Sequence, residues 1–183
     1  HLIIDKAINF NGEYKNTELT DGKIVLKEGF LDGSYESKEY DVLAFSEAVG
    51  SWNCITSKTQ TAELQVSVCV NNKWSKFLSY GQWGLGKENY YYNDGDEIAD
   101  IKVDEIIIKN DLLADKIKYR VILKRCDINE QSPELSLVAL TFVIPNYSYP
   151  VDATSLPSSV DYDVPLLYQH DVKKVGNVIC SAT

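Results

Sequence analysis

The chain has 183 residues, of which 44% are hydrophobic and 25% charged, and this composition excludes a disordered tail, a collagen or a coiled coil. Acidic residues outnumber basic ones 27 to 18, which gives a formal net charge of −9. Nucleic acid and anionic lipid need a basic footprint, so we expect neither as a partner. The longest apolar stretch, residues 135–144, is too short to cross a bilayer as a helix, so we expect no membrane span. Since the chain begins at His1 and lacks methionine, we expect it not to be a complete reading frame.

The first elements that the pattern predicts are β-strands. Residues 23–30 alternate in hydropathy, and the first forty residues carry glycines that are typical of turns. In residues 63–70 the alternation predicts a half-buried strand with two distinct faces. The inner face holds Leu64, Val66, Val68 and Val70, and the outer face holds Glu63, Gln65, Ser67 and Cys69. Asn71-Asn72 then predicts a tight hairpin into a strand over 73–80, because asparagine tolerates positive φ.

Further strands are predicted over residues 100–109, 116–126 and 135–144, separated by breaks rich in Asp, Asn and Gly. Within 116–126, alternation places Tyr119, Val121 and Leu123 on one face of the strand. No sustained helical stripe precedes Val172. Regularly spaced short strands of this kind predict an all-β fold, an antiparallel β-sandwich or jelly roll, over residues 1–145.

The composition changes after Ile144, where four of the five prolines fall within a short stretch. Proline lacks the amide donor that a central strand needs, so the sheet is predicted to end there. We interpret residues 146–160 as a Pro-rich linker and residues 161–183 as the incomplete start of a second domain, since so short a segment cannot bury its own core.

Four cysteines are present, at positions 54, 69, 126 and 180, and none forms a CxxC pair or a zinc-type spacing with histidine. A disulfide among the first three stays possible. Gln169 precedes Cys180, which is followed by small residues that suit a helix start. A helix N-terminus stabilises a thiolate, and a glutamine amide can donate to an oxyanion. The alternative is that Cys180 is a small apolar residue in a terminal peptide.

The motifs around these two residues resemble those of C39-like cysteine peptidases. The tail resembles the opening of their catalytic domain, and the body resembles the β-sandwich that precedes it in some bacterial members. The matching segments are Asp163-Val164-Pro165, Tyr168-Gln169, Cys180-Ser181-Ala182-Thr183, SWNCIT from Ser51, VSVCV from Val66, WSKFLSYGQW from Trp74, YRVILKR from Tyr119, and Ser132-Pro133.

The resemblance implies a papain-like α+β domain after the linker, with Cys180 as nucleophile and Gln169 contributing to the oxyanion hole. It implies a secreted or envelope-associated bacterial peptidase that acts on a peptide or cell-wall-associated substrate without a cofactor. Ser181 stands where glycine is usual, and the family's later His and Asp/Asn are absent from this chain. We therefore expect the 183-residue chain alone to be inactive, and an exposed apolar tail to permit homo-oligomerisation.

Two other hypotheses come from the body of the chain. The acidic cluster Asp94, Asp96, Glu97 and Asp100 fails the EF-hand spacing, so we expect a solvated turn rather than a metal site. The aromatic set Trp74, Tyr80, Trp83, Tyr90, Tyr91 and Tyr92 suggests sugar stacking, although aromatic residues on strands more often pack in a core. A non-catalytic carbohydrate- or cell-wall-binding module is thus the alternative function.

Overall fold

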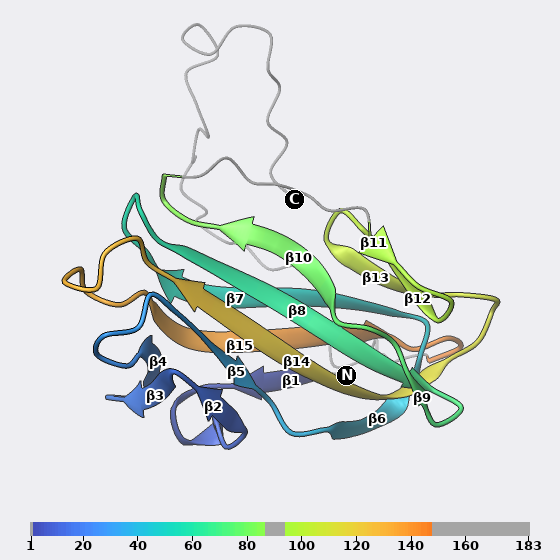
Figure 1. Cartoon of the computed structure of the whole chain (residues 1–183). Coiled ribbons are helices and arrows are strands. Elements are labelled where there is room, and N and C mark those ends of the chain that lie inside the picture. Colours follow the sequence, from blue (N-terminus) through green and yellow to red (C-terminus); the bar gives the residue numbers. More distant parts are fainter. Residues whose placement is uncertain (1, 87–93, 148–183) are drawn as a thin grey trace, which may run out of the picture. The chain divides into compact units, whose positions relative to one another are not determined.

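The computed structural model describes residues 2–86 and 94–147, which lie in one unit, and almost all of its regular structure is antiparallel β (Figure 1). The one helical element described is a single 3-10 turn at Ala7–Asn9. The strands are β1 (Leu2–Asp5), β2 (Glu13–Lys15), β3 (Thr17–Thr20), β4 (Lys23–Leu26), β5 (Asp32–Glu36), β6 (Tyr40–Phe45), β7 (Glu47–Ile55), β8 (Thr61–Val70), β9 (Lys73–Trp74), β10 (Leu78–Trp83), β11 (Asp94–Gly95), β12 (Ala99–Lys102), β13 (Glu105–Ile108), β14 (Ala114–Lys124) and β15 (Glu134–Val143). The predicted all-β fold class is confirmed.

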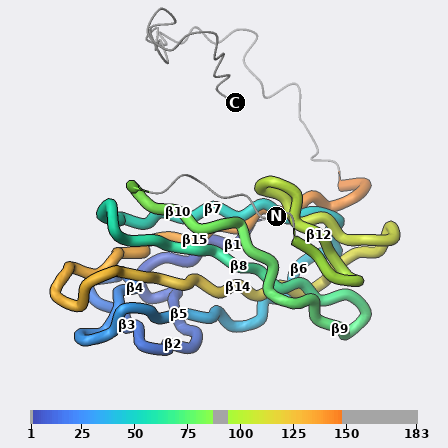
Figure 2. The backbone as a smooth tube through the Cα atoms, turned by 45° about the horizontal axis from the view of Figure 1, so that its top comes forward, coloured from blue at the N-terminus to red at the C-terminus, as the bar shows by residue number. Residues whose placement is uncertain are grey.

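The strands form two curled sheets that pack face to face (Figure 2). The first sheet has the order β11-β12-β13-β7-β15-β4-β3, with β1 also paired to β15. The second has the order β10-β8-β14-β5-β2, with β6 paired to β14 and β9 to β8. Two long antiparallel pairs, β7–β15 and β8–β14, form the centres of the sheets. The two pairs belong to one β-sandwich, because each sheet has one apolar face that is buried against the other sheet.

The core confirms the predicted inner faces. Residues 64, 66, 68 and 70 on β8 are buried, and so are Tyr119, Val121 and Leu123 on β14. Their partners across the sandwich include Ile106, Leu135 and Leu140 of the first sheet. The predicted hairpin is also confirmed, because Asn71 and Asn72 both have positive φ, at 51° and 63°, between β8 and β9.

The outer face of β8 corrects one prediction. Glu63, Ser67 and Cys69 are buried as well, so the strand is covered on both sides rather than half-buried. The cover comes from the segment that follows the hairpin: Ser67 Oγ donates to Ser75 O at 2.7 Å. The polar residues are tolerated there because they are hydrogen-bonded, which offsets their loss of water.

Three predicted strand lengths are wrong. Residues 23–30 form a strand only to Leu26, and the chain then turns through Gly29, whose φ is +79°. Residues 73–80 divide into the short β9 and the start of β10. Residues 100–109 are the two strands β12 and β13, joined by a turn in which Val103 takes a φ of +60°. Gly33, expected in a turn, lies within β5, where a Cβ would come within 2.8 Å of the Asn16 carbonyl oxygen.

The boundary at residue 145, the linker over 146–160 and the domain opening over 161–183 stay predictions, because nearly all of this stretch lies outside the described residues. Within the described part of the chain, no helix is long and apolar enough to span a membrane.

Candidate functional site

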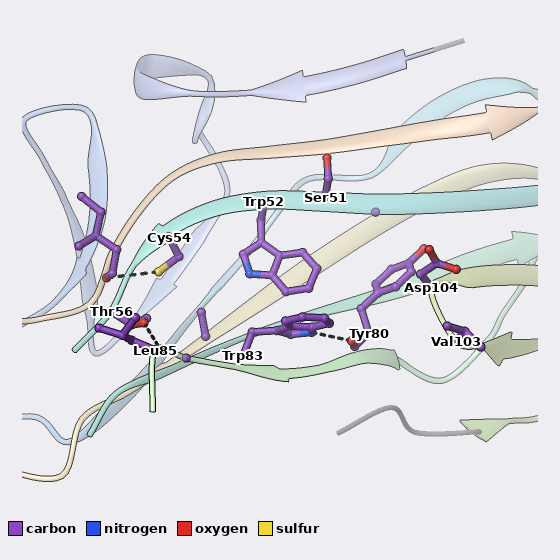
Figure 3. Close-up of a pocket in the computed structure, with 13 residues that line it drawn as sticks. Ser51, Trp52, Cys54, Thr56, Tyr80, Trp83, Leu85, Val103 and Asp104 are labelled. Carbon is purple, nitrogen blue, oxygen red and sulfur yellow. Dashed lines mark hydrogen bonds between the residues drawn. The ribbon is translucent and has the colours of Figure 1, made fainter. Parts of the chain in front are cut away.

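A cavity of about 680 Å³ lies between the two sheets at the edge formed by β10 (Figure 3). Its walls come from β7, β8, β10, the residues just after β7 and β10, and the β12–β13 turn. The described residues that line it are Gly50, Ser51, Trp52, Cys54, Ile55, Thr56, Ala62, Tyr80, Trp83, Gly84, Leu85, Val103 and Asp104. The size is that of a small-molecule site, and most of the lining is apolar, as such sites generally are.

Two tryptophans from different sheets meet in this cavity. Trp52 projects from β7 and Trp83 from β10, with ring centroids 5.9 Å apart and planes at 79° (Figure 3). This edge-to-face arrangement is a favoured geometry for aromatic pairs. Both residues come from segments that carry the peptidase resemblance, SWNCIT and WSKFLSYGQW. The sandwich thus brings two separate sequence motifs to one site.

Tyr80 forms the floor between these two strands. Its hydroxyl donates to Ala48 O at 2.9 Å, and its own carbonyl accepts from Trp83 Nε1 at 2.9 Å. The ring reaches across because Gly50 leaves room: a Cβ there would lie 2.8 Å from both Leu64 Cδ2 and Tyr80 Cε2. The glycine of β7 is therefore a requirement of close packing between the sheets.

Asp104 is the one charged residue among the described lining, and it gives one end of the cavity a negative field. Burial raises the pKa of Tyr80 above its ordinary range, and the charges of Asp104 and Glu105 add to that effect. Glu105 in turn has a raised pKa, first because it shares a hydrogen bond with Glu47 and then through partial burial. No lysine or arginine of the described residues lines the cavity.

Cys54 lines the cavity but is not suited to nucleophilic attack. Burial raises the pKa of its thiol to about 12, so the thiolate is scarce near neutral pH. Cys69 is buried and its thiol pKa is also raised, mainly by burial, whereas Cys126 is exposed. These three cysteines are free thiols, so no disulfide joins them.

The predicted catalytic residues are not among those the structure describes. Cys180 and Gln169 both lie outside the described residues and stay predictions. The chain's two histidines, His1 and His170, lie outside them as well. The described residues consequently hold no thiol–imidazole pair of the kind that cysteine peptidases use.

Other residues of the resemblance hold loops together. The Arg125 guanidinium donates to three backbone carbonyls, those of Phe30 at 2.8 Å, Glu130 at 2.6 Å and Lys27 at 3.2 Å. Ser132 Oγ accepts from Leu26 N at 2.6 Å. The YRVILKR strand and the Ser132-Pro133 pair therefore fasten the loop after β4 and the loop after β14 at the same end of the sandwich.

The carboxylates of the acidic cluster already pair with other groups of the same chain. Asp94 pairs with Lys76 at 2.6 Å and Asp100 with Lys109 at 2.7 Å. Glu97 pairs with Lys73 at 2.5 Å, between two largely exposed side chains. Asp96 instead accepts the backbone N–H groups of residues 76, 98 and 99. Within the described ranges, no group of three or more potential ligands is arranged to hold a metal ion.

The predicted aromatic platform does not form as one surface. Tyr80 is buried, and Trp83 lies in the cavity. Trp74 is elsewhere: together with Phe77 it packs against Lys118, whose Nζ lies 5.4 Å from the Trp74 ring centroid and 5.1 Å from that of Phe77. Tyr90, Tyr91 and Tyr92 lie outside the described residues. The aromatic set predicted from the sequence did not include Trp52. The one feature of the sequence that pointed to this residue is that it lies in the SWNCIT motif.

Comparison with known proteins agrees with this assembly of motifs. The family model described as Peptidase C39 N-terminal domain matches residues 4–142. A search of curated proteins gave no match. The matched range runs from β1 almost to the end of β15 and includes the cavity, the Arg125 cluster and both sheets. The chain therefore belongs to the Peptidase C39 N-terminal domain family.

Proposed function

We propose that this chain is the N-terminal accessory domain of a C39-family cysteine peptidase, followed by the first residues of the catalytic domain. The observation that carries the proposal is the order of two features along the chain. The family match stops at residue 142, at the end of the sandwich, and the peptidase-like segments Asp163-Val164-Pro165 and Cys180–Thr183 follow after a proline-rich stretch. This order favours an arrangement in which an accessory domain precedes the catalytic nucleophile.

The proposed chemistry belongs to Cys180. Its thiolate would attack the carbonyl carbon of a peptide bond, and the Gln169 amide would donate to the oxyanion of the tetrahedral intermediate. Collapse of that intermediate breaks the C–N bond and leaves a thioester on the cysteine. A histidine encoded downstream would protonate the departing amine and then activate the water that hydrolyses the thioester.

The sandwich itself supports an accessory role rather than a catalytic one. The pKa of the Cys54 thiol is raised to about 12 by burial, and Cys69 is buried. Cys126 is exposed, but its thiol donates to Thr59 O at 3.1 Å and no histidine of the described residues can serve it as a base. Each described thiol thus lacks a partner that would activate it.

The test compares the parent protein, carrying its downstream sequence, with the 183-residue chain. Hydrolysis of peptide substrates should be lost on Cys180→Ala and retained on Cys126→Ala, which removes an exposed thiol of the sandwich. The 183-residue chain should be inactive, because it lacks the downstream base. A downstream sequence without a His followed by Asp or Asn, or Cys180-dependent turnover by the short chain, would contradict the proposal.

We also propose that the parent is a secreted or envelope-associated bacterial protein with a peptide or cell-wall-associated substrate, on the family resemblance alone. The alternative, a carbohydrate-binding module, receives less support from the geometry. Sugar platforms need ring faces on one surface, whereas Trp74 and Trp83 lie at different sites and Tyr80 is buried.

A further inference from the structure

The cavity between the sheets has a hydrogen-bonding pattern that restricts what it can hold. Most of its polar side-chain groups already have partners within the protein. The Tyr80 hydroxyl donates to Ala48 O, Trp83 Nε1 donates to Tyr80 O, and Thr56 Oγ1 accepts from Leu85 N at 3.0 Å. The Ser51 hydroxyl points to the opposite side of β7 from Trp52 (Figure 3). The rings of Tyr80 and Trp83 therefore act as apolar walls rather than as hydrogen-bonding groups.

Of the lining side chains that face the cavity, the Trp52 indole and the Asp104 carboxylate have no hydrogen-bond or ion-pair partner among the described residues. Trp52 lies against Trp83, and Asp104 lies near Tyr80 at the other end of the cavity (Figure 3). An occupant complements them with one acceptor or π-face near the indole and one cationic group near the exposed carboxylate. It needs few other polar atoms, since few lining side chains are left to pair with them.

We propose that this cavity binds a small organic amine, with its apolar body against the rings of Trp52 and Trp83 and its ammonium group beside Asp104. Charge complementarity supports the cation: Asp104 is the one charged described residue of the lining, Glu105 adds to its field at Tyr80, and no described lysine or arginine competes. The net charge of −9 also raises the local concentration of cations. Aromatic walls favour a cation further, through the negative faces of their rings.

A sugar fits these observations less well. A sugar ring presents several hydroxyl groups, each of which needs a partner when water is removed. The side chains of the cavity offer few groups to pair with them: Tyr80 and Trp83 already donate within the protein and Thr56 already accepts from Leu85 N, which leaves chiefly the Trp52 N–H and the Asp104 carboxylate. An anionic ligand is disfavoured by Asp104 itself.

The experiment is a titration of the isotope-labelled 183-residue chain with phenethylamine, followed by NMR of the tryptophan indole N–H groups. The chain has three tryptophans, so each resonance can be assigned by substitution. The resonances of Trp52 and Trp83 should shift saturably, and that of Trp74, which packs against Lys118 away from the cavity, should not. Phenethyl alcohol should bind more weakly than the amine, and 3-phenylpropionate more weakly still.

Two variants locate the interaction. Asp104→Asn keeps the shape of this exposed side chain and removes its charge. It should weaken phenethylamine binding about two- to fivefold, as expected for a solvent-exposed ion pair, and should leave the affinity for phenethyl alcohol unchanged. Asp32→Asn, on β5 three strands from β10, is the matched control and should leave both ligands unaffected. Trp52→Ala should abolish the saturable shift of Trp83.

Four results would overturn the proposal: no saturable shift of Trp52 and Trp83 up to the solubility limit of the amine, an equal shift of Trp74, equal affinity for the amine and the carboxylate, or no effect of Asp104→Asn. A saturable response to N-acetylglucosamine but not to phenethylamine would assign the cavity to a sugar instead. None of these readouts depends on Cys180, so the result is separate from the proposed catalysis.

Discussion

Asp5 and Tyr119 join the two sheets: the Tyr119 hydroxyl donates to Asp5 Oδ2 at 2.6 Å, with both side chains buried. Asp5 ends β1 in the first sheet, and Tyr119 lies on β14 in the second. Tyr40 of β6 donates to the same carboxylate oxygen. A single buried carboxylate thus accepts two phenol hydroxyls from the opposite sheet, which ties the N-terminal strand to the centre of the sandwich.

Replacement of Asp5 by alanine should therefore destabilise the fold. The substitution leaves the buried hydroxyl of Tyr119 and the partly buried hydroxyl of Tyr40 without their acceptor, and we expect the free energy of unfolding to fall by about 1 to 3 kcal/mol. Urea denaturation followed by fluorescence measures this. Asp115→Ala, an exposed position on β14, is the control and should change stability by less than about 0.5 kcal/mol. Equal midpoints for the two variants would show that the contact contributes nothing.

Strand faces were predictable from the sequence, and strand ends were not. Alternation correctly placed Val66 and Val68 of β8, and Tyr119 of β14, in the core, because one buried face imposes a period of two. The turn at Val103 was missed, since a β-branched residue at positive φ runs against the local preferences on which turn prediction depends. Burial of Ser67 on the outer face comes from Ser75, a contact that alternation cannot reveal.

The cavity was only partly predictable. The sequence motifs drew attention to the segments that contain Trp52 and Trp83, but nothing local indicated that the two rings meet. Their contact requires β7 and β10 to lie in different sheets and to face each other, which is a property of the topology. Grouping aromatics by closeness in sequence instead combined Trp74 with Trp83, and the intervening bulge and the short β9 send these residues to separate sites.

The buried tyrosines should make stability fall at alkaline pH. Burial raises the pKa of Tyr35 to about 12, while a tyrosine in the unfolded chain ionises near its ordinary pKa of 10.0. The stabilising contribution of protonated Tyr35 is complete below the unfolded pKa, because both states then hold the proton. It is lost as the pH rises from about 10 to about 12, where the unfolded state loses protons first.

Denaturant unfolding at a series of alkaline pH values, with tyrosinate absorbance recorded in parallel, measures this decline. Tyr40 and Tyr119 have raised pKa values from burial and from Asp5, so they should contribute in the same direction. Tyr35→Phe should show a shallower decline than the unsubstituted chain, since one titrating group is gone. Stability that stays constant to the highest pH would contradict the burial of these hydroxyls.

The thiols should differ in their reactivity with iodoacetamide. At mildly alkaline pH, Cys126 should be alkylated before Cys54, because Cys126 is exposed whereas the Cys54 thiol has a pKa of about 12. Cys69 should react slowly as well, since it is buried. Peptide mapping by mass spectrometry assigns each modified site, and denaturant should equalise the three rates. Early labelling of Cys54 in the native chain would show that its thiol is not held in its protonated form.

Arg125 should contribute to stability through geometry as well as charge. Its fork donates to the carbonyls of Lys27, Phe30 and Glu130, and lysine cannot reach all three from one point. We expect Arg125→Lys to lower the free energy of unfolding by about 1 to 3 kcal/mol, because a lysine in this buried position cannot replace all three hydrogen bonds. Lys124→Ala, at an exposed neighbouring position, should have a small effect. If Arg125→Lys unfolded at the same denaturant concentration as the unsubstituted chain, the guanidinium fork would not be required.

Gly50 is a position in β7 where a single added methyl group should destabilise the fold. A Cβ there would lie 2.8 Å from Leu64 Cδ2 and from Tyr80 Cε2, closer than carbon atoms pack, and both partners are buried. Gly50→Ala should therefore force the sheets apart or displace the Tyr80 ring, at a cost of about 1 to 3 kcal/mol. Ser51→Ala, one residue away on the exposed side of the strand, should cost little.

The same substitution should also change the cavity, since Tyr80 forms its floor. Displacement of that ring should shift the indole resonances of Trp83, whose N–H donates to the Tyr80 carbonyl, and weaken phenethylamine binding. Ser51→Ala should leave both unchanged. A Gly50→Ala variant as stable as the unsubstituted chain, with unchanged Trp83 resonances, would mean that β7 and β10 do not approach as closely as the Gly50–Tyr80 contact requires.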